Sequence, residues 1–158
     1  MKNTKFIIQA AVIAAVYATL TIALMPFSYG VMQVRVSEAL TILPFFTPAA
    51  IPGLFIGCVV SNMVGPYGLL DMVLGSSATL IAAVCSYYLR GKPFLVPLPP
   101  VVANGAIIGG MLYYAYSVPM PLIACILWVA AGELIACYAI GYPLLKILKK
   151  YKKIFELH

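Results

Sequence analysis

The chain has 158 residues, of which 64% are hydrophobic and 9% are charged, with a formal net charge of +6. Soluble domains carry about 25% charged residues, so this composition leaves too little charge to cover a water-facing surface and excludes a soluble enzyme. A spanning helix needs about 20 residues, which leaves room for one domain of five or six spans. We therefore predict an all-α integral membrane protein in which residues 1–158 form a single transmembrane domain.

Apolar runs and their proline and glycine boundaries define the predicted helices. Four long runs predict helices over residues 5–25, 69–89, 97–117 and 120–146. The stretch before residue 64 is interrupted by several prolines, so it predicts two short helices, 37–47 and 49–63, with a tight turn near Pro48. The sequence thus predicts a bundle of six transmembrane helices.

Basic residues indicate the orientation of this bundle, because they collect on the cytoplasmic side of a membrane. With the N-terminus inside, Arg90 and Lys92 follow the fourth helix and a lysine-rich tail, residues 146–153, follows the sixth. Six helices, or five with a re-entrant pair, therefore leave both termini cytoplasmic. The tail could instead be a nucleic-acid arm, but no aromatic residues alternate with a folded basic face, so we expect no nucleic-acid partner.

Polar side chains inside the predicted spans are expected to have a functional or structural role, because placing a charge at the bilayer centre costs about 2.5 to 3.5 kcal/mol. Glu133 and Asn104 lie near the middle of the sixth and fifth helices, where they are expected to converge on one ligand. The alternative for both is a hydrogen bond between helices. Asp71 and Asn62 lie at the outer rim, where Asp71 could simply cap the fourth helix.

Arg35 and Glu38 lie three residues apart and therefore share a helix face or a tight turn. As an exposed pair they would contribute little to stability. They follow a loop that contains Phe27, Tyr29, Val31 and Met32. We expect this loop to fold over a pocket that opens to the outside, with Glu38 turned toward the ligand.

The first predicted helix carries a ridge of small residues, Ala10, Ala14 and Ala18, at a spacing of four. Small residues at this spacing let two helices approach closely in lipid. The ridge either packs inside the fold or forms a docking surface for another membrane protein.

Motifs of catalysis are missing from the sequence. The one histidine is His158, and the four cysteines stand singly, without metal-ligand spacing. We find no nucleophile–histidine grouping and no phosphate-binding glycine loop. We therefore expect no enzyme activity, metal, cofactor or disulfide, and any ATP hydrolysis must come from a partner.

Three segments carry a resemblance to a known family: QVRVSEALTILP at 33–44, PGLFIGCVVSN at 52–62 and DMVLGS at 71–76. Together with the alanine ridge they resemble the QueT family, the substrate-binding S components of energy-coupling factor (ECF) transporters for queuosine precursors. The resemblance extends over essentially the whole chain. It implies a protein of a bacterial cell membrane that captures queuine or a related deazaguanine base from outside. It also implies an ECF module of one scaffold subunit and two ATPases, which releases the ligand by toppling the S component.

The candidate site residues suit such a ligand. A guanine-like edge presents adjacent N–H donors, which a carboxylate accepts in bidentate fashion. Glu133, Glu38 or Asp71 would supply that carboxylate, and Asn104 or Asn62 would read the ring carbonyl and nitrogens.

Trp128 is the first candidate to stack on the flat ring, because it lies five residues from Glu133. Within this family the ridge of Ala10, Ala14 and Ala18 would dock the ECF module. Two other functions stay open: an S component for another small planar vitamin, and a non-transporting membrane scaffold protein. Thermal stabilisation by ligand separates them, because a scaffold should show none.

Overall fold

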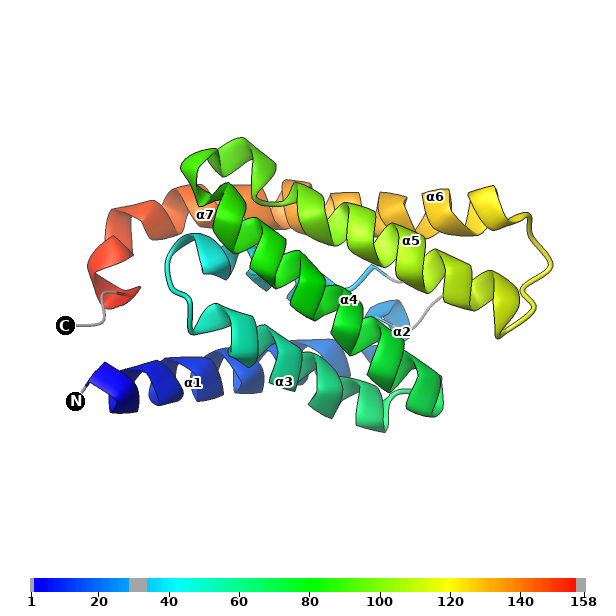
Figure 1. Ribbon diagram of the computed structural model, residues 1–158, viewed down its shortest axis with the longest axis horizontal. Coiled ribbons are helices and arrows are strands. Elements are labelled where there is room, and N and C mark those ends of the chain that lie inside the picture. The colour runs from blue at the N-terminus through cyan, green and yellow to red at the C-terminus, as the bar shows by residue number, and fades with distance from the viewer. Residues whose placement is uncertain (1, 29–33, 156–158) are drawn as a thin grey trace.

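The computed structural model describes residues 2–28 and 34–155, and the regular secondary structure of these ranges is entirely helical (Figure 1). The all-α prediction is therefore confirmed. The elements in chain order are α1 (Lys2–Ala23), α2 (Met25–Ser28), η1 (Val36–Phe45), α3 (Ala50–Val64), α4 (Gly68–Tyr88), η2 (Leu89–Gly91), η3 (Pro93–Leu95), α5 (Leu98–Tyr114), α6 (Leu122–Leu134), η4 (Ile135–Gly141), α7 (Tyr142–Leu148) and η5 (Lys149–Phe155).

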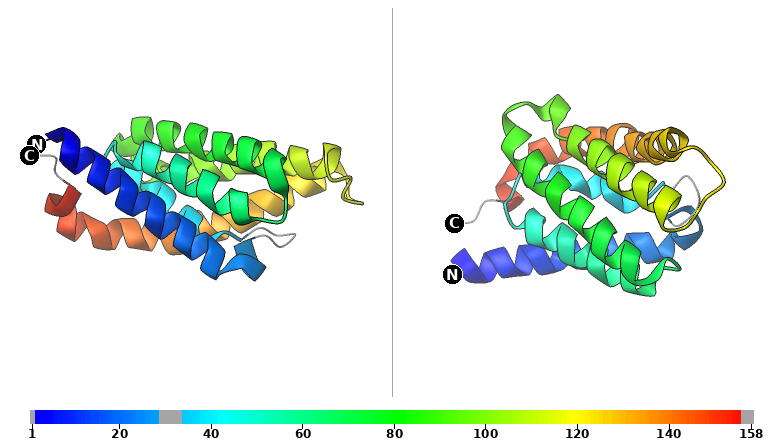
Figure 2. Two further views of the ribbon diagram at one scale, coloured as in Figure 1. Left: turned by 90° about the horizontal axis from the view of Figure 1, so that it is seen from below. Right: turned by 45° about the vertical axis from the view of Figure 1, so that its right-hand side comes forward.

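The long helices lie side by side along one axis (Figures 1 and 2). The N-terminal end of α1, the C-terminal η5 and the η2–η3 connection lie at one end of the bundle, and the turn after α3 and the α5–α6 loop lie at the other. In sequence order, α1 packs on α3, α3 on α4, α4 on α5 and α5 on α6. The short η1 lies among α1, α3, α4 and η4, so it forms the centre of the bundle.

Four helical stretches are long and apolar enough to cross a membrane, which identifies the chain as a membrane protein. They cover Asn3–Ala23, Gly68–Gly91, Pro93–Tyr114 and Leu122–Phe155. The other two predicted helices, η1 and α3, are apolar but shorter, with 10 and 15 residues. Pro44 helps to explain why η1 is short, because it lies inside η1 and has no N–H to continue the helix.

The last predicted helix, 120–146, differs from a regular α-helix in the structure. It consists of α6, the π-helical η4 and α7 in succession. Pro143 in the first turn of α7 cannot donate a backbone hydrogen bond to the preceding turn, and a wider π turn accommodates this loss. Glu133 lies just before this wide turn and Cys137 lies within it.

The alanine ridge of α1 packs inside the fold. Ala10, Ala14 and Ala18 are 8–9% exposed. A Cβ added at Gly53 of α3 would lie 2.8 Å from the Ala10 carbonyl oxygen, and one at Gly57 would lie 2.8 Å from that of Ala14. The two helices therefore touch through their small residues, which is the internal-packing alternative for this ridge.

We predict that Gly57→Ala destabilises the protein, because the added methyl would also lie 2.9 Å from the Tyr17 Cβ. Overpacking of this kind costs about 1–3 kcal/mol, whereas alanine in place of an unhindered helical glycine gains up to about 1 kcal/mol. Gly110→Ala on α5 is the matched control, because the described residues leave open space around it. Thermal unfolding in detergent should show a lower midpoint for Gly57→Ala only; equal midpoints would contradict the close α1–α3 contact.

Candidate functional site

The interior of the bundle contains the acidic side chains of the described residues. Glu38 and Asp71 are fully buried and Glu133 is 2% exposed, while the fourth acidic residue, at position 156, lies outside the described ranges. Arg35, 4% exposed, is buried with them. Because hydrocarbon penalises isolated charges, each of these groups is expected to bind a partner inside the protein.

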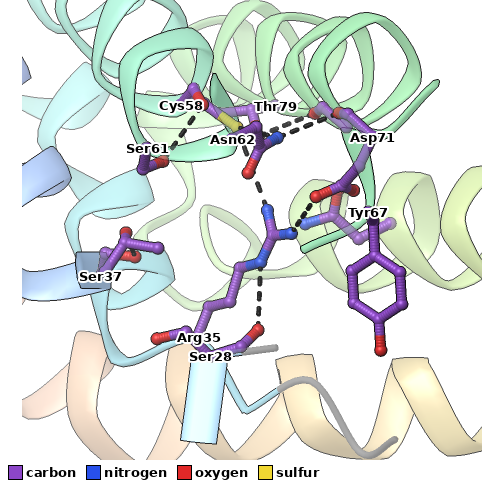
Figure 3. A network of polar contacts seen from close by, with 12 residues as sticks. Ser28, Arg35, Ser37, Cys58, Ser61, Asn62, Tyr67, Asp71 and Thr79 are labelled. Carbon is purple, nitrogen blue, oxygen red and sulfur yellow. Dashed lines mark hydrogen bonds and ion pairs between the residues drawn. The ribbon is translucent and has the colours of Figure 1, made fainter. Parts of the chain in front are cut away.

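Arg35 and Asp71 form a buried ion pair between the segment before η1 and the first turn of α4. The Arg35 Nη2 lies 2.9 Å from the Asp71 Oδ2 (Figure 3). The Arg35 Nε also donates to the Ser28 carbonyl oxygen, 3.4 Å away, which ties the guanidinium to the end of α2. No side-chain cap is formed at the start of α4, where Asp71 lies in the first turn and pairs with Arg35.

Three side chains of α3 and α4 extend this contact. The Asn62 Nδ2 donates to the Asp71 carbonyl oxygen at 2.9 Å, and it lies 3.4 Å from the Cys58 Sγ. The Thr79 hydroxyl lies 3.4 Å from the same sulfur (Figure 3). We call Arg35, Asp71, Asn62, Cys58 and Thr79 the Arg35 network.

A second group of contacts joins η1 to α1, α5 and the α6–η4 segment. The Tyr17 hydroxyl of α1 donates to the Glu38 Oε1. The Asn104 Nδ2 of α5 donates to the Glu133 Oε1 at 2.9 Å. The Cys137 thiol lies 3.6 Å from the Glu133 Oε2 and 3.5 Å from the Glu38 carbonyl oxygen, so it connects the two glutamates. We call these five residues the Glu38 network.

Several buried polar atoms have no hydrogen-bond partner among the described residues. Three are acceptor oxygens of predicted site residues: the Glu38 Oε2, the Asn62 Oδ1 and the Asp71 Oδ1. Native interiors rarely leave such atoms unsatisfied, so each one calls for an explanation. These three acceptors can take N–H or O–H donors from another molecule.

The structure brings six of the seven predicted site residues into these two networks and leaves one outside. Glu133 and Asn104 bond to each other, which is the hydrogen bond between helices that the sequence left open as the alternative to a shared ligand. Trp128 is 42% exposed and lies outside both networks. Residues 29–33 of the predicted closing loop and the side chain of Phe27 fall outside what the structure describes.

Sequence reasoning missed Tyr17, Cys58, Thr79 and Cys137. Each is a weakly polar residue inside an apolar helix, a setting in which such residues often serve packing alone. For Tyr17 a signal was present, because it follows Ala10 and Ala14 on the face of α1 that carries the small-residue ridge. The two cysteines gave none.

The fold and these networks together define an apolar helical membrane protein with a charged, acceptor-rich interior. The family model for the QueT transporter matches residues 7–150, so the chain belongs to that family. Over 85 residues the chain is 38% identical to the queuosine precursor transporter QueT of Lactococcus lactis subsp. cremoris (strain MG1363). That match covers 51% of this chain and 50% of the relative, so the chain matches about half the length of that protein. No solved structure matches the chain.

We predict that Arg35→Gln and Asp71→Asn are each strongly destabilising alone, because each leaves a buried charge without its partner. Breaking a buried pair in this way costs about 3–5 kcal/mol. The double variant removes both charges and should lose less than the sum of the two single losses. Thermal unfolding of the three variants in detergent measures this; additive losses would show that the two side chains are not energetically coupled.

Proposed function

We propose that this protein is the S component of an ECF transporter and that it captures a queuosine precursor with a deazaguanine ring. Membership of the QueT transporter family and the name of the Lactococcus relative support this proposal. The observation that carries it is the set of buried acceptors on Glu38, Asn62 and Asp71 that have no donor among residues 2–28 and 34–155.

A deazaguanine edge has the complementary chemistry. Its ring N–H and its amino group are adjacent donors, and hydrogen bonds from such donors to a carboxylate are about twice as strong as neutral ones. In the proposed complex the Glu38 Oε2 accepts from this edge while its Oε1 stays bound to Tyr17. The Asn62 Oδ1 and the Asp71 Oδ1 accept further donors of the ligand.

Glu133 has a different part in this proposal. Its Oε1 accepts from Asn104 and its Oε2 lies within reach of the Cys137 thiol, so both oxygens already have donors. We therefore propose that Glu133 holds the Asn104 amide in position and that Glu38 reads the base edge. The sequence alone left open whether Glu133, Glu38 or Asp71 reads the base edge.

We propose that tyrosines at the rim of the Arg35 network, and not the exposed Trp128, stack on the ring of the ligand. Tyr67 lies beside Asp71 in Figure 3, and its ring lies 5.2 Å from that of Tyr116. The Tyr116 hydroxyl donates to the Tyr67 carbonyl oxygen, which fixes the pair. Aromatic faces held in this way can stack on a flat heterocycle.

The proposed orientation follows from the two ends of the bundle. The end that holds η2, η3 and η5 carries the exposed basic residues of the described chain, and we propose that it faces the cytoplasm. With η1 and α3 embedded in the membrane, this makes six helices with both termini inside. Arg35 and Asp71 lie toward the opposite end, so the proposed site opens to the outside. Partner ATPases supply the energy for release.

We predict that Glu38→Gln weakens binding of queuine about tenfold or more. The glutamine carbonyl can still accept from Tyr17, but its NH₂ group then faces the donors of the ligand, and a charged hydrogen bond of about 1.5–3 kcal/mol is lost. Glu133→Gln is the matched control, because a glutamine carbonyl still accepts from Asn104, and its affinity should change less.

Titration of the purified variants with queuine, its aminomethyl and nitrile analogues and an unrelated planar vitamin measures these affinities. If Glu133→Gln alone weakens binding, the two glutamates have the opposite roles. If wild type binds only the unrelated vitamin, the deazaguanine assignment is wrong. If nothing in the panel binds or stabilises the protein, the chain is better explained as a scaffold.

We predict that the ECF module docks on the exposed side of α1, because the ridge of Ala10, Ala14 and Ala18 is covered by α3. Ala11 and Ala15 are small and exposed. Ala15→Trp should therefore abolish cellular uptake while the purified protein still binds ligand. Ala14→Trp should lose both, because the tryptophan would meet Gly57 of α3. Normal uptake by Ala15→Trp would exclude this docking face.

A further inference from the structure

The exposed charges of the described chain are all positive. The basic side chains other than Arg35, which is buried, and Lys2, whose side chain is not described, are exposed, whereas the described acidic side chains are buried. The exposed set consists of Lys5, Arg90, Lys92, Lys146, Lys149, Lys150, Lys152 and Lys153. The segments that carry them, namely the start of α1, the η2–η3 connection, α7 and η5, lie at the bundle end that contains both described chain ends (Figure 1). The positive-inside rule accounts for their sign and side, but not for the way that the tail folds.

The C-terminal segment bends back onto α1. Tyr151 has a non-helical conformation (φ −113°, ψ 25°), and the chain turns there toward the N-terminal end of α1 (Figures 1 and 2). Phe155 stacks on Phe46, with ring centroids 5.0 Å apart and an interplanar angle of 24°. The Gln9 Nε2 donates to the Ile154 carbonyl oxygen at 3.4 Å. The tail is therefore held by side chains of α1 and of the turn after η1.

This fold creates an apolar groove of about 180 Å³ between α1 and η5, lined by Ile8, Gln9, Val12, Ile13, Ile154 and Phe155. Its apolar rim is open to the surroundings, because Ile8 and Val12 are 56% exposed and Ile154 is 70% exposed. Lys153 precedes Ile154 directly, and Lys5 lies four residues before Gln9, on the same face of α1. An exposed lysine thus lies close in sequence to the lining residues on each side of this groove.

We propose that this groove binds one anionic phospholipid of the adjacent leaflet. An acyl chain lies along Ile8, Val12 and Ile154, and the phosphate lies between Lys5 and Lys153. The charge of the two lysines favours an anionic lipid, because each lysine near a membrane surface is attracted to anionic headgroups. A polybasic segment next to a spanning helix is also typical of proteins that bind anionic lipids. Bound lipid would hold the tail against α1. The proposal requires only that the protein lies in a bilayer, and it does not depend on the transported ligand.

The test is native mass spectrometry of the full chain in detergent, titrated with phosphatidylglycerol or phosphatidylcholine of the same acyl chains. The wild-type protein should retain phosphatidylglycerol in preference to phosphatidylcholine. The double variant Lys5→Gln/Lys153→Gln should bind it about 30-fold more weakly, at about 1 kcal/mol for each lysine. The control Arg90→Gln/Lys92→Gln removes the same charge at the same end of the bundle, on the η2–η3 connection, and should bind as wild type does.

A second pair of variants tests the groove without changing charge. Val12→Trp fills the groove and should reduce retention of phosphatidylglycerol, whereas Ile7→Trp lies on α1 outside the groove lining and should not. The proposal is overturned if wild type shows no preference for the anionic lipid. It is equally overturned if both double variants lose affinity alike, which would indicate general charge attraction, or if Val12→Trp binds as wild type does.

Discussion

Charged groups buried in an apolar bundle impose the constraint on which the rest of this structure depends. A bilayer interior offers no water to solvate them, so an unpaired ion there is costly and its partner must come from the protein. Arg35 meets Asp71 of α4, Glu38 meets Tyr17 of α1, and Glu133 on α6 meets an amide of α5. Each contact joins a different pair of elements. Satisfying the charges therefore also sets how the helices are arranged.

The short η1 makes this arrangement possible. It is a 3₁₀ helix, a form with poorer hydrogen-bond geometry than an α-helix, and it is surrounded by other helices. Side-chain hydroxyls compensate within it: the Thr41 Oγ1 donates to the Glu38 carbonyl oxygen at 2.6 Å, and the Ser37 hydroxyl lies 2.6 Å from that of Thr21 on α1. η1 also contacts both α1 and α3, which pack closely on each other through alanine and glycine.

The fold followed from the sequence to a large extent, and the site followed in part. Apolar runs bounded by proline and glycine predicted helices close to those observed, because length and hydropathy decide which segments enter a membrane. The ridge on α1 was ambiguous, since alanine packs equally well against α3 or a partner. The spacing of Trp128 from Glu133 did not by itself place the two side chains together. Five residues of an α-helix exceed one full turn by about 140°, so Trp128 and Glu133 lie on different sides of α6.

The balance of donors and acceptors in the interior is the feature on which the proposed ligand site rests. A structural core should satisfy its own hydrogen bonds, as Glu133 and Asn104 do. Around Glu38, Asn62 and Asp71 the described residues instead leave three acceptor oxygens without donors. Among the described side chains, Arg35 is the one buried cation, whereas three carboxyl groups are buried. In the proposed complex a ligand rich in N–H donors would bond to these oxygens, whereas a ligand that presents only acceptors would leave them unpaired and add unpaired acceptors of its own. Under the proposed function, this excess of acceptors over donors would itself favour donor-rich ligands over acceptor-rich ones.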